Sequence, residues 1–184
     1  MIFKCVLCSD NSFKIVCKNC AKKYLKTKLK KNNNVYSFYD YDVMEHFNKY
    51  KYQKRGDIIY KYLSKPLAEF SKNFKFKAYL IPVDDVPKYF SHTAILANAM
   101  KSGYLTAQFG SLRAASKAKY AGKPLEYRLN NPRNFIYKGL KNVNAILIDD
   151  IKTTGITLNE AQETLKKYGV NVIFSIVLSD KSIR

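Results

Sequence analysis

The hydrophobic pattern of this chain consists of short apolar runs that alternate with longer amphipathic stretches. Apolar residues alternate with polar ones over residues 35–41 and are nearly continuous in three later runs, which cover residues 78–83, 144–150 and 170–178. A continuous apolar run of this length is typical of a parallel strand that is buried on both faces. The pattern therefore predicts four strands, three of them in the interior of a sheet.

Helical periodicity fills the stretches between these predicted strands. Apolar residues recur every three or four positions within residues 43–53, 58–74, 94–100 and 158–169. Pro66 starts or kinks a turn inside the second stretch, and Gly169 ends the last. Strands that alternate with helices predict an α/β fold with a doubly wound, mostly parallel sheet, whose ligand crevice lies beyond the carboxyl ends of the strands.

Two regions do not follow this alternation. Residues 103–138 contain several glycines and prolines, which predict a loop-rich arm with one short helix over residues 124–130. The first 24 residues lack a periodic apolar pattern, and residues 26–34 (KTKLKKNNN) have the charged, Asn-rich composition of a linker. We therefore divide the chain into a small N-terminal module with its linker, residues 1–34, and a main domain, residues 35–184.

The composition is that of an ordinary globular protein. The chain has 184 residues, of which 47% are hydrophobic and 26% charged, so one full-sized domain can form a core without a crosslink. Neither a signal peptide nor a run of about 20 apolar residues is visible. These features predict a cytoplasmic protein that does not insert into a membrane.

Four cysteines in the first 20 residues form the pattern C-x2-C-x8-C-x2-C, with ligand candidates Cys5, Cys8, Cys17 and Cys20. In a reducing compartment such a cluster indicates metal ligation or redox chemistry rather than disulfides. Two facing C-x2-C pairs complete a tetrahedral four-thiolate site suited to zinc, with iron as the minor alternative. Because four thiolates leave no open position for a substrate, the predicted zinc is structural. A thioredoxin-like redox motif is the rival, but it needs only one C-x2-C pair in a larger fold.

The most informative motif follows the apolar run NAILI. Asp149 and Asp150 end the predicted strand, and Lys152, Thr153, Thr154, Gly155, Ile156 and Thr157 lead into the predicted helix. A glycine among small hydroxyl residues allows successive backbone N–H groups to surround a phosphate at a helix N-terminus. Two adjacent carboxylates suit vicinal ribose hydroxyls, directly or through magnesium. The motif therefore predicts a sugar-phosphate site.

A simpler interpretation is a tight strand-to-helix turn in which Asp150 is merely acidic and Thr157 is the helix N-cap. That interpretation accounts for one Asp or Thr, but not for two carboxylates and three threonines around one glycine. Neither G-x-x-x-x-G-K-[ST] nor G-x-G-x-x-G occurs in the sequence. Their absence argues against a P-loop NTPase and against a dinucleotide-binding Rossmann site.

The segment ILIDDIKTTGIT resembles the phosphoribosyl pyrophosphate signature of type I phosphoribosyltransferases. The resemblance implies that Asp149 and Asp150 bind the ribose hydroxyls, with these two carboxylates as the candidate catalytic residues. It also implies that residues 152–157 hold the 5′-phosphate and that magnesium accompanies the ligand. The family's pyrophosphate loop follows an earlier strand, and Val83, Asp84 and Asp85 are similar in placement.

The chain is strongly basic, with 33 Lys and Arg against 14 Asp and Glu and a formal net charge of +19. Such a charge favours polyanionic partners such as nucleic acid, but it is also what an AT-rich genome produces by coding bias. Basic residues in weakly regular segments could serve a phosphate ligand or DNA: Lys54, Arg55, Arg113, Lys117, Lys119, Lys123, Arg128 and Arg133. His92 is open to a packing or a catalytic role.

An N-terminal four-cysteine knuckle followed by a C-terminal DD-x-x-TTG loop resembles the ComF family, the ComFC type associated with natural competence. Further similar segments are YDYDVMEHFNKYKYQKRGD, IPVDDVPKYFSHTAILANAM and KAKYAGKPLEYRLNNPRNF. One departure is that many members carry R-G-F-N where this chain has Lys88 to His92, so a contact by that Arg or Asn is not expected here.

The ComF resemblance implies a protein that binds phosphoribosyl pyrophosphate and handles incoming single-stranded DNA together with other competence proteins. Two alternatives stay open from the sequence. One is a phosphoribosyltransferase of nucleotide metabolism with an unknown acceptor, and the other is a regulator that senses phosphoribosyl pyrophosphate without turning it over.

Overall fold

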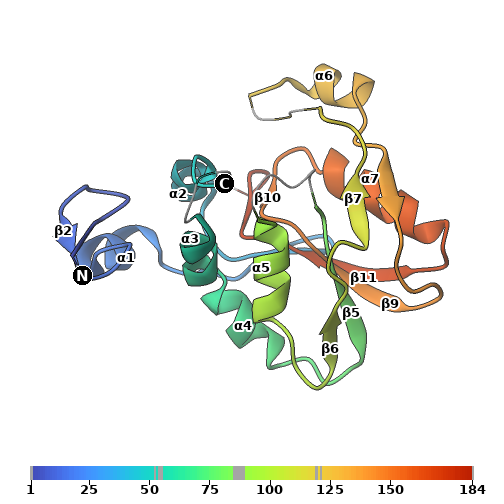
Figure 1. Cartoon of the computed structure of the whole chain (residues 1–184), viewed down its shortest axis with the longest axis horizontal. Helices are drawn as coiled ribbons and strands as arrows, with labels where there is room; N and C mark the ends of the chain where they lie inside the picture. Colours follow the sequence, from blue (N-terminus) through green and yellow to red (C-terminus); the bar gives the residue numbers. More distant parts are fainter. Residues whose placement is uncertain are drawn as a thin grey trace.

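A parallel sheet forms the centre of the molecule (Figure 1). The computed structural model describes residues 2–51, 53, 56–84, 90–118, 120 and 122–183. Within these residues six strands form the sheet in the order β3-β4-β11-β9-β5-β6, and only the β3 to β4 pairing is antiparallel. The strands are β3 (Lys30–Asn32), β4 (Val35–Ser37), β11 (Asn171–Ile176), β9 (Asn144–Ile148), β5 (Ala78–Pro82) and β6 (Leu105–Ala107).

The apolar runs form interior strands because each buries side chains on both faces. In β9, Ile146 and Ile148 belong to one hydrophobic core and Ala145 and Leu147 to the other, and all four are completely buried. A sheet covered on both faces requires strands without polar alternation. The predicted doubly wound α/β fold is therefore confirmed.

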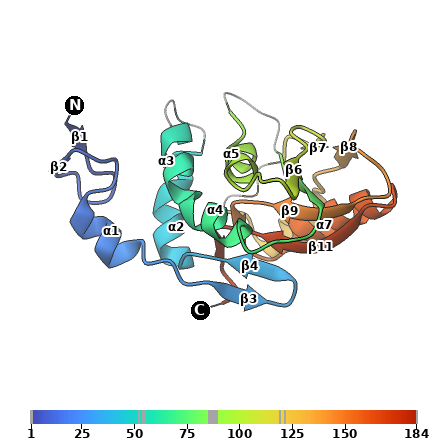
Figure 2. The ribbon, with the colours of Figure 1, turned by 90° about the horizontal axis from the view of Figure 1, so that it is seen from below.

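Helices of the first half of the chain cover one face of the sheet, and α7 (Ile156–Lys166) covers the other (Figure 2). The first set consists of α2 (Tyr41–Asn48), α3 (Gly56–Leu63), α4 (Lys65–Ser71) and α5 (His92–Ala99). The periodic stretch 58–74 is divided between two helices. Pro66 stands in the first turn of α4, where a missing N–H costs nothing, so this proline starts the second helix.

The irregular region after β6 contains more structure than the sequence indicates. Strands β7 (Leu112–Ala114) and β8 (Phe135–Tyr137) form an antiparallel hairpin that packs on α7. Their connection is an arm that carries α6 (Leu125–Asn130), as predicted, and that extends beyond the sheet in Figure 1. None of the residues of α6 is buried.

The N-terminal module lies to one side of the sheet in both ribbon views. It consists of β1 (Phe3–Lys4), β2 (Asn11–Ser12) and α1 (Lys18–Tyr24). The stretch interpreted as a linker also contributes β3, so the central sheet begins inside it. In the described part of the chain, no helix has the length and apolar character needed to cross a membrane.

Candidate functional site

Acidic residues gather at the carboxyl edge of the sheet, where three neighbouring parallel strands end. Asp84 follows β5, and Asp149 and Asp150 follow β9. The chain beyond β11 reaches β12 (Ser179–Asp180), which pairs in parallel with β10 (Ile151–Lys152) of the loop after the acidic pair. All four carboxylates are buried, with exposed fractions between 3% and 7%. This edge is where a doubly wound sheet binds its ligand.

The carboxylate of Asp150 is surrounded by polar groups from three earlier elements. The Lys51 ammonium lies 3.1 Å from Oδ2, the Tyr60 hydroxyl donates to Oδ2 at 3.3 Å, and His92 Nε2 lies 3.4 Å from the same oxygen. The backbone N–H of Ile151 donates to Oδ1 at 2.9 Å. Burial alone would raise the pKa of Asp150, but the charges of Lys51 and His92 lower it below its ordinary value. Asp150 is therefore ionised at neutral pH.

Asp149 has a different environment although it is the next residue. Among the described residues, the backbone N–H of Asp150 is the hydrogen-bond donor to its carboxylate, at 2.8 Å from Oδ1. Burial, followed by the negative charge of Asp150, raises the pKa of Asp149 well above its ordinary value. The adjacent carboxyl groups thus differ in their partners and in the direction of their pKa shifts.

The loop after the acidic pair has the geometry of an anion-binding turn. Gly155 takes a left-handed conformation, with φ of 81°, and is the N-cap of α7 without a side-chain cap bond. The interpretation with Thr157 as N-cap is wrong, because Thr157 lies inside the helix. The first N–H groups of α7 therefore have no side-chain acceptor at the cap, and the positive end of the helix faces residues 153–155.

Lys152 and Thr153, both predicted phosphate-loop residues, have side chains engaged by other segments. The Lys152 ammonium lies 2.6 Å from a carboxylate oxygen of Asp180 and 3.0 Å from the Ser182 hydroxyl. This ion pair contributes to an Asp180 pKa below its ordinary value despite burial. The Thr153 hydroxyl accepts a hydrogen bond from Arg128. Within the loop, Lys152 thus offers its backbone rather than its ammonium.

The contact with Arg128 links the arm to the loop. The guanidinium groups of Arg128 and Arg133 lie over the Tyr120 ring at 5.6 and 4.7 Å from its centroid. Arg133 also donates to the carbonyl of Ala118 at 2.7 Å. Among the other candidate basic residues, Arg113 in β7 and Lys117 in the connection after it are exposed. The backbone carbonyl of Lys123 accepts a hydrogen bond from Arg128 at 3.1 Å. The remaining ones, Lys54, Arg55 and Lys119, lie outside the described residues.

The described start of the predicted pyrophosphate loop, Val83 and Asp84, is held in place by buried contacts. Val83 is buried, and the Asp84 carboxylate accepts hydrogen bonds from the hydroxyls of Ser91 and, at 2.7 Å, Thr93. Ser91 is also the N-cap of α5, where its hydroxyl accepts from the N–H of Ala94 at 2.9 Å. Asp85, together with the departing positions Lys88 and Tyr89, lies outside the described residues.

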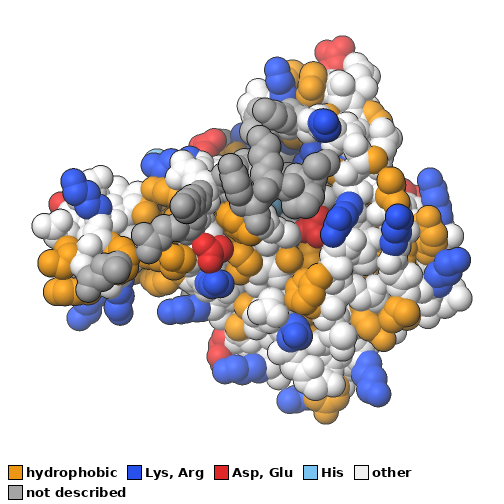
Figure 3. All heavy atoms as spheres, in the orientation of Figure 1, with side chains coloured by type: hydrophobic (Ala, Val, Ile, Leu, Met, Phe, Trp, Pro, Cys, Tyr) orange, Lys and Arg blue, Asp and Glu red, His pale blue; other side chains and the backbone are white. Residues whose placement is uncertain are grey.

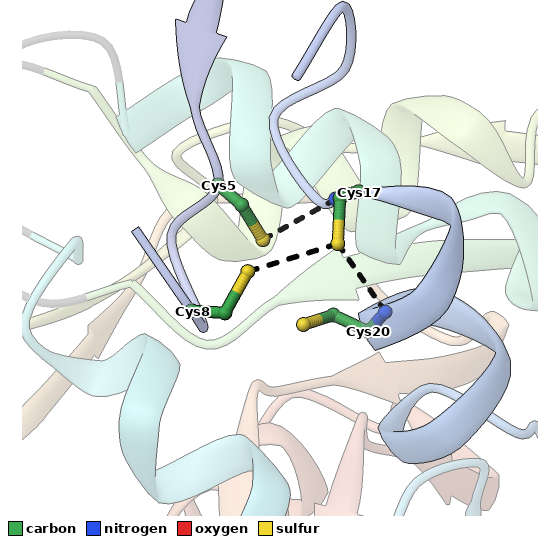
Figure 4. A group of neighbouring side chains, drawn as sticks. All are labelled: Cys5, Cys8, Cys17 and Cys20. Atoms are coloured by element: carbon green, nitrogen blue, oxygen red, sulfur yellow. Dashed lines mark hydrogen bonds between the residues drawn. The ribbon is translucent and has the colours of Figure 1, made fainter. Parts of the chain in front are cut away.

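Two groups of side chains could hold a metal ion. Cys5, Cys8, Cys17 and Cys20 bring their sulfur atoms within 4.8 Å of one another (Figure 4). Cys8 and Cys17 sulfurs lie 3.8 Å apart, and backbone N–H groups donate to the sulfurs of Cys5 at 3.3 Å and Cys17 at 3.4 Å. Burial raises the pKa of the Cys5 thiol, but backbone hydrogen bonds lower it to about 6. A four-sulfur donor set with N–H support fits zinc.

The second group lies at the sheet edge. His92, Asp149 and Asp150 each bring one ligand atom within 4.8 Å of the others. Carboxylates suit magnesium, although the Lys51 ammonium is already on one of them. Lys51 and Tyr60 were missed as site residues in the sequence, since they stand 99 and 90 positions before Asp150. The segment YDYDVMEHFNKYKYQKRGD, residues 39–57, which the sequence analysis singled out for its resemblance, contains Lys51 but not Tyr60.

Comparison with known proteins identifies the fold. No protein-family model and no curated protein sequence matches the chain. Adenine phosphoribosyl transferase from Trypanosoma brucei, solved with AMP, pyrophosphate and ribose-5-phosphate, is similar in structure with a TM-score of 0.50. The match covers 85% of this chain and 87% of that one at 12% sequence identity.

A second similar structure is a hypoxanthine phosphoribosyltransferase from Staphylococcus aureus. Its TM-score is 0.42 at 18% identity, and the match covers 67% of this chain but only 64% of that one. The chain therefore has a phosphoribosyltransferase-like α/β fold with a mostly parallel central sheet, together with four clustered cysteines that could form a zinc site.

Proposed function

We propose that this protein binds phosphoribosyl pyrophosphate with magnesium at the carboxyl edge of its central sheet. The observation that carries the proposal is the direct succession of a buried acidic pair, a left-handed Gly155 and a helix N-terminus without a side-chain cap. A carboxylate pair suits ribose hydroxyls, and the N–H groups of a helix start suit a phosphate. A sugar phosphate carries both kinds of group, ribose hydroxyls and a phosphate.

Each part of the site then has a task in our proposal. The loop from Lys152 to Thr157 holds the 5′-phosphate through its backbone N–H groups and threonine hydroxyls, while Asp149 and Asp150 face the ribose. The start of the pyrophosphate loop at Val83 and Asp84 lies on the neighbouring strand. Magnesium bound with the ligand would neutralise the diphosphate, and the carboxylates are suited to hold it.

We further propose the ComF-type role, in which the protein contributes to the handling of incoming single-stranded DNA in natural competence. The distribution of charge supports it, because residues 1–34 contain nine lysines and a single acidic residue, Asp10. Exposed apolar side chains accompany them, including Phe13 at 80% exposure. Figure 3 shows that basic side chains elsewhere on this face are scattered rather than gathered into one stripe. The N-terminal module is therefore where we expect nucleic acid to bind.

The two alternative functions, a transferase with an unknown acceptor and a non-catalytic sensor, use the same ligand site as the competence role. Assays of DNA binding and of reaction with an acceptor therefore distinguish the three functions. Binding of a single-stranded oligonucleotide that weakens steeply with salt favours the competence role. Pyrophosphate release that requires one particular acceptor favours the transferase. Ligand binding with neither property favours the sensor.

Calorimetric titration tests the proposed ligand directly. Phosphoribosyl pyrophosphate with magnesium is titrated into the wild type, into the Asp149→Asn/Asp150→Asn variant and into Asp57→Asn as a control. Asp57 is an acidic residue of α3 that pairs with Lys61 at 3.0 Å on the surface. We expect a Kd on the order of micromolar for wild type and control, and no measurable binding by the double variant. Absence of binding to the wild type, or equal binding by the double variant, would refute the proposal.

A further inference from the structure

Protein groups already donate hydrogen bonds to most of the acceptor positions of the Asp150 carboxylate. A carboxylate has about four lone-pair positions. Asp150 receives the Ile151 N–H and the Lys51 ammonium at Oδ1, at 2.9 and 3.3 Å, and Lys51, Tyr60 and His92 at Oδ2, at 3.1 to 3.4 Å. Three of these contacts are hydrogen bonds, from the Ile151 N–H, the Lys51 ammonium and the Tyr60 hydroxyl, and His92 Nε2 adds a close electrostatic contact. Protein groups therefore occupy most of the hydrogen-bonding positions of this carboxylate.

Asp149 has the capacity that Asp150 lacks. Its Oδ1 accepts one backbone N–H, and no other described residue donates a hydrogen bond to its carboxylate. The side chain is nevertheless 93% buried, since its residue exposure is 7%. Its other oxygen is not among the fully buried polar atoms without a hydrogen-bond partner in the described part of the chain, so this side of the carboxyl group is open to a ligand. Asp149 is thus the member of the pair with room for a hydroxyl donor.

We propose that the two carboxylates have separate tasks: Asp149 accepts the hydroxyls of the sugar phosphate, and Lys51 is a positioning residue that holds Asp150 as a fixed anchor beside it. This inference rests on the proposed ligand and refines its site. Tyr60 and His92 complete the arrangement from α3 and α5, and their rings lie 5.3 Å apart. Asp150 thereby connects the end of β9 to α3 and α5, two of the helices that cover this face of the sheet.

The position of Lys51 supports a holding role. Its side chain is 18% exposed and that of Asp150 only 5%, so the pair is shielded from water and screened little by salt. Removing one member of such a pair leaves the other charge without its partner, whereas replacing both relieves that penalty. Lys51 and Asp150 should therefore behave as one unit under mutation.

A double-mutant cycle on ligand affinity tests this unit. The variants are Lys51→Met, Asp150→Asn and the two combined, with Lys72→Met as a charge-matched control. Lys72 pairs with Glu69 at 2.6 Å, and both side chains are exposed, at 70% and 74%. If Lys51 acts through Asp150, each single variant weakens binding of phosphoribosyl pyrophosphate about tenfold, and the combined variant is no weaker than the poorer single one. Asp149→Asn should weaken binding further in each of these backgrounds.

Additive effects would overturn the inference. If Lys51→Met weakens binding by the same factor whether residue 150 is Asp or Asn, Lys51 contacts the ligand itself and is not a positioning residue. Equal loss of affinity in Asp149→Asn and Asp150→Asn, with additive combination, would show that both carboxylates accept the hydroxyls. Absence of binding by the wild type would refute the proposed function and this refinement with it, which distinguishes the two failures. Thermal unfolding of the same variants without ligand verifies that each is folded.

Discussion

At the scale of single residues, the main feature is a pair of adjacent carboxyl groups whose pKa values are shifted in opposite directions. Asp150 is ionised because Lys51 and His92 offset the cost of its burial. Asp149 is equally buried, and the charge of its neighbour adds to the effect of burial. Such a difference between neighbouring titratable groups is typical of functional sites, because a site that is optimised for stability alone would not retain the second carboxyl.

Replacing Asp149 by Asn should stabilise the protein at neutral pH. The pKa of Asp149 in the folded protein lies above its ordinary value of 3.8, so folding favours the protonated form and loses stability as pH rises through the raised pKa. Asn resembles the protonated carboxyl and keeps the acceptor for the N–H of Asp150. We expect a gain in the free energy of unfolding at neutral pH.

Urea unfolding across pH measures this gain. The difference from wild type should shrink towards zero as pH falls to the ordinary carboxyl pKa, since both proteins are then neutral at residue 149. The Asp57→Asn exchange, at a partly exposed position, serves as the comparison and should show no such trend. A loss of stability at neutral pH in Asp149→Asn would contradict the assigned charge state.

At the scale of elements, β10 and β12 fix the start of the phosphate loop. Their parallel pairing places Lys152 beside Asp180 and Ser182, and the Asn32 amide of β3 donates to Ser182 at 2.9 Å. The loop is thus connected to the C-terminal segment and to the first strand of the sheet. The ammonium of Lys152 is bound to Asp180 and Ser182 in this connection.

The Lys152→Met variant tests whether the Lys152 ammonium stabilises the fold through Asp180 or binds the ligand. Its buried partner Asp180 would lose a charged hydrogen bond, which should lower the free energy of unfolding by about 1–3 kcal/mol. Because the loop uses the backbone of residue 152, the affinity for phosphoribosyl pyrophosphate should change less than threefold, that is by under about 0.7 kcal/mol. Calorimetry and urea unfolding of the same sample provide both values. A large loss of affinity without a loss of stability would show that the Lys152 ammonium contacts the ligand directly.

The elements that could be predicted from the sequence are those with a strong local pattern. The apolar runs of β5, β9 and β11, the amphipathic stretches of α2 and α7, and the helix start at Pro66 all depend on neighbouring residues. Strands β6, β7 and β8 were missed because three residues are too few to show a period of two. Strand β3 was missed because its sequence, KKN, has no apolar residue.

The same distinction applies to the candidate site. The cysteines, the acidic pair and Gly155 form contiguous motifs, so their spacing alone indicates their chemistry. The partners of these residues come from distant segments, as Lys51 and Tyr60 do for Asp150 and Arg128 does for Thr153. Such pairings are determined by how helices and the arm pack on the sheet, which no local spacing specifies.

At the scale of the whole molecule, the N-terminal module should depend on metal while the main domain does not. Its buried residues are few, namely Cys5, Val16 and Cys20, and its strands have two residues each. These three side chains belong to the same hydrophobic cluster as part of the main domain, which also has a second core of its own. Removal of metal should therefore expose residues 1–24 to protease and leave the unfolding transition of the rest in place.

Limited proteolysis with and without a chelator, followed by mass determination of the fragments, measures this dependence. A Cys20→Ser variant should behave like the chelated wild type, and added zinc should restore resistance to the wild type alone. Unchanged protease resistance after metal removal would contradict a structural metal site.

Strand β3 also determines how the sheet avoids self-association. It is the outer strand next to β4, it runs antiparallel to the others, and Lys30 and Lys31 stand on it. Charged side chains on an outer strand oppose the addition of a further strand from another molecule. A shortened chain that began at Val35 would lack strand β3, so the uncharged strand β4 would become the exposed edge of the sheet. We expect such a chain to aggregate on concentration, whereas one that begins before Lys30 should stay dispersed, and light scattering would distinguish them.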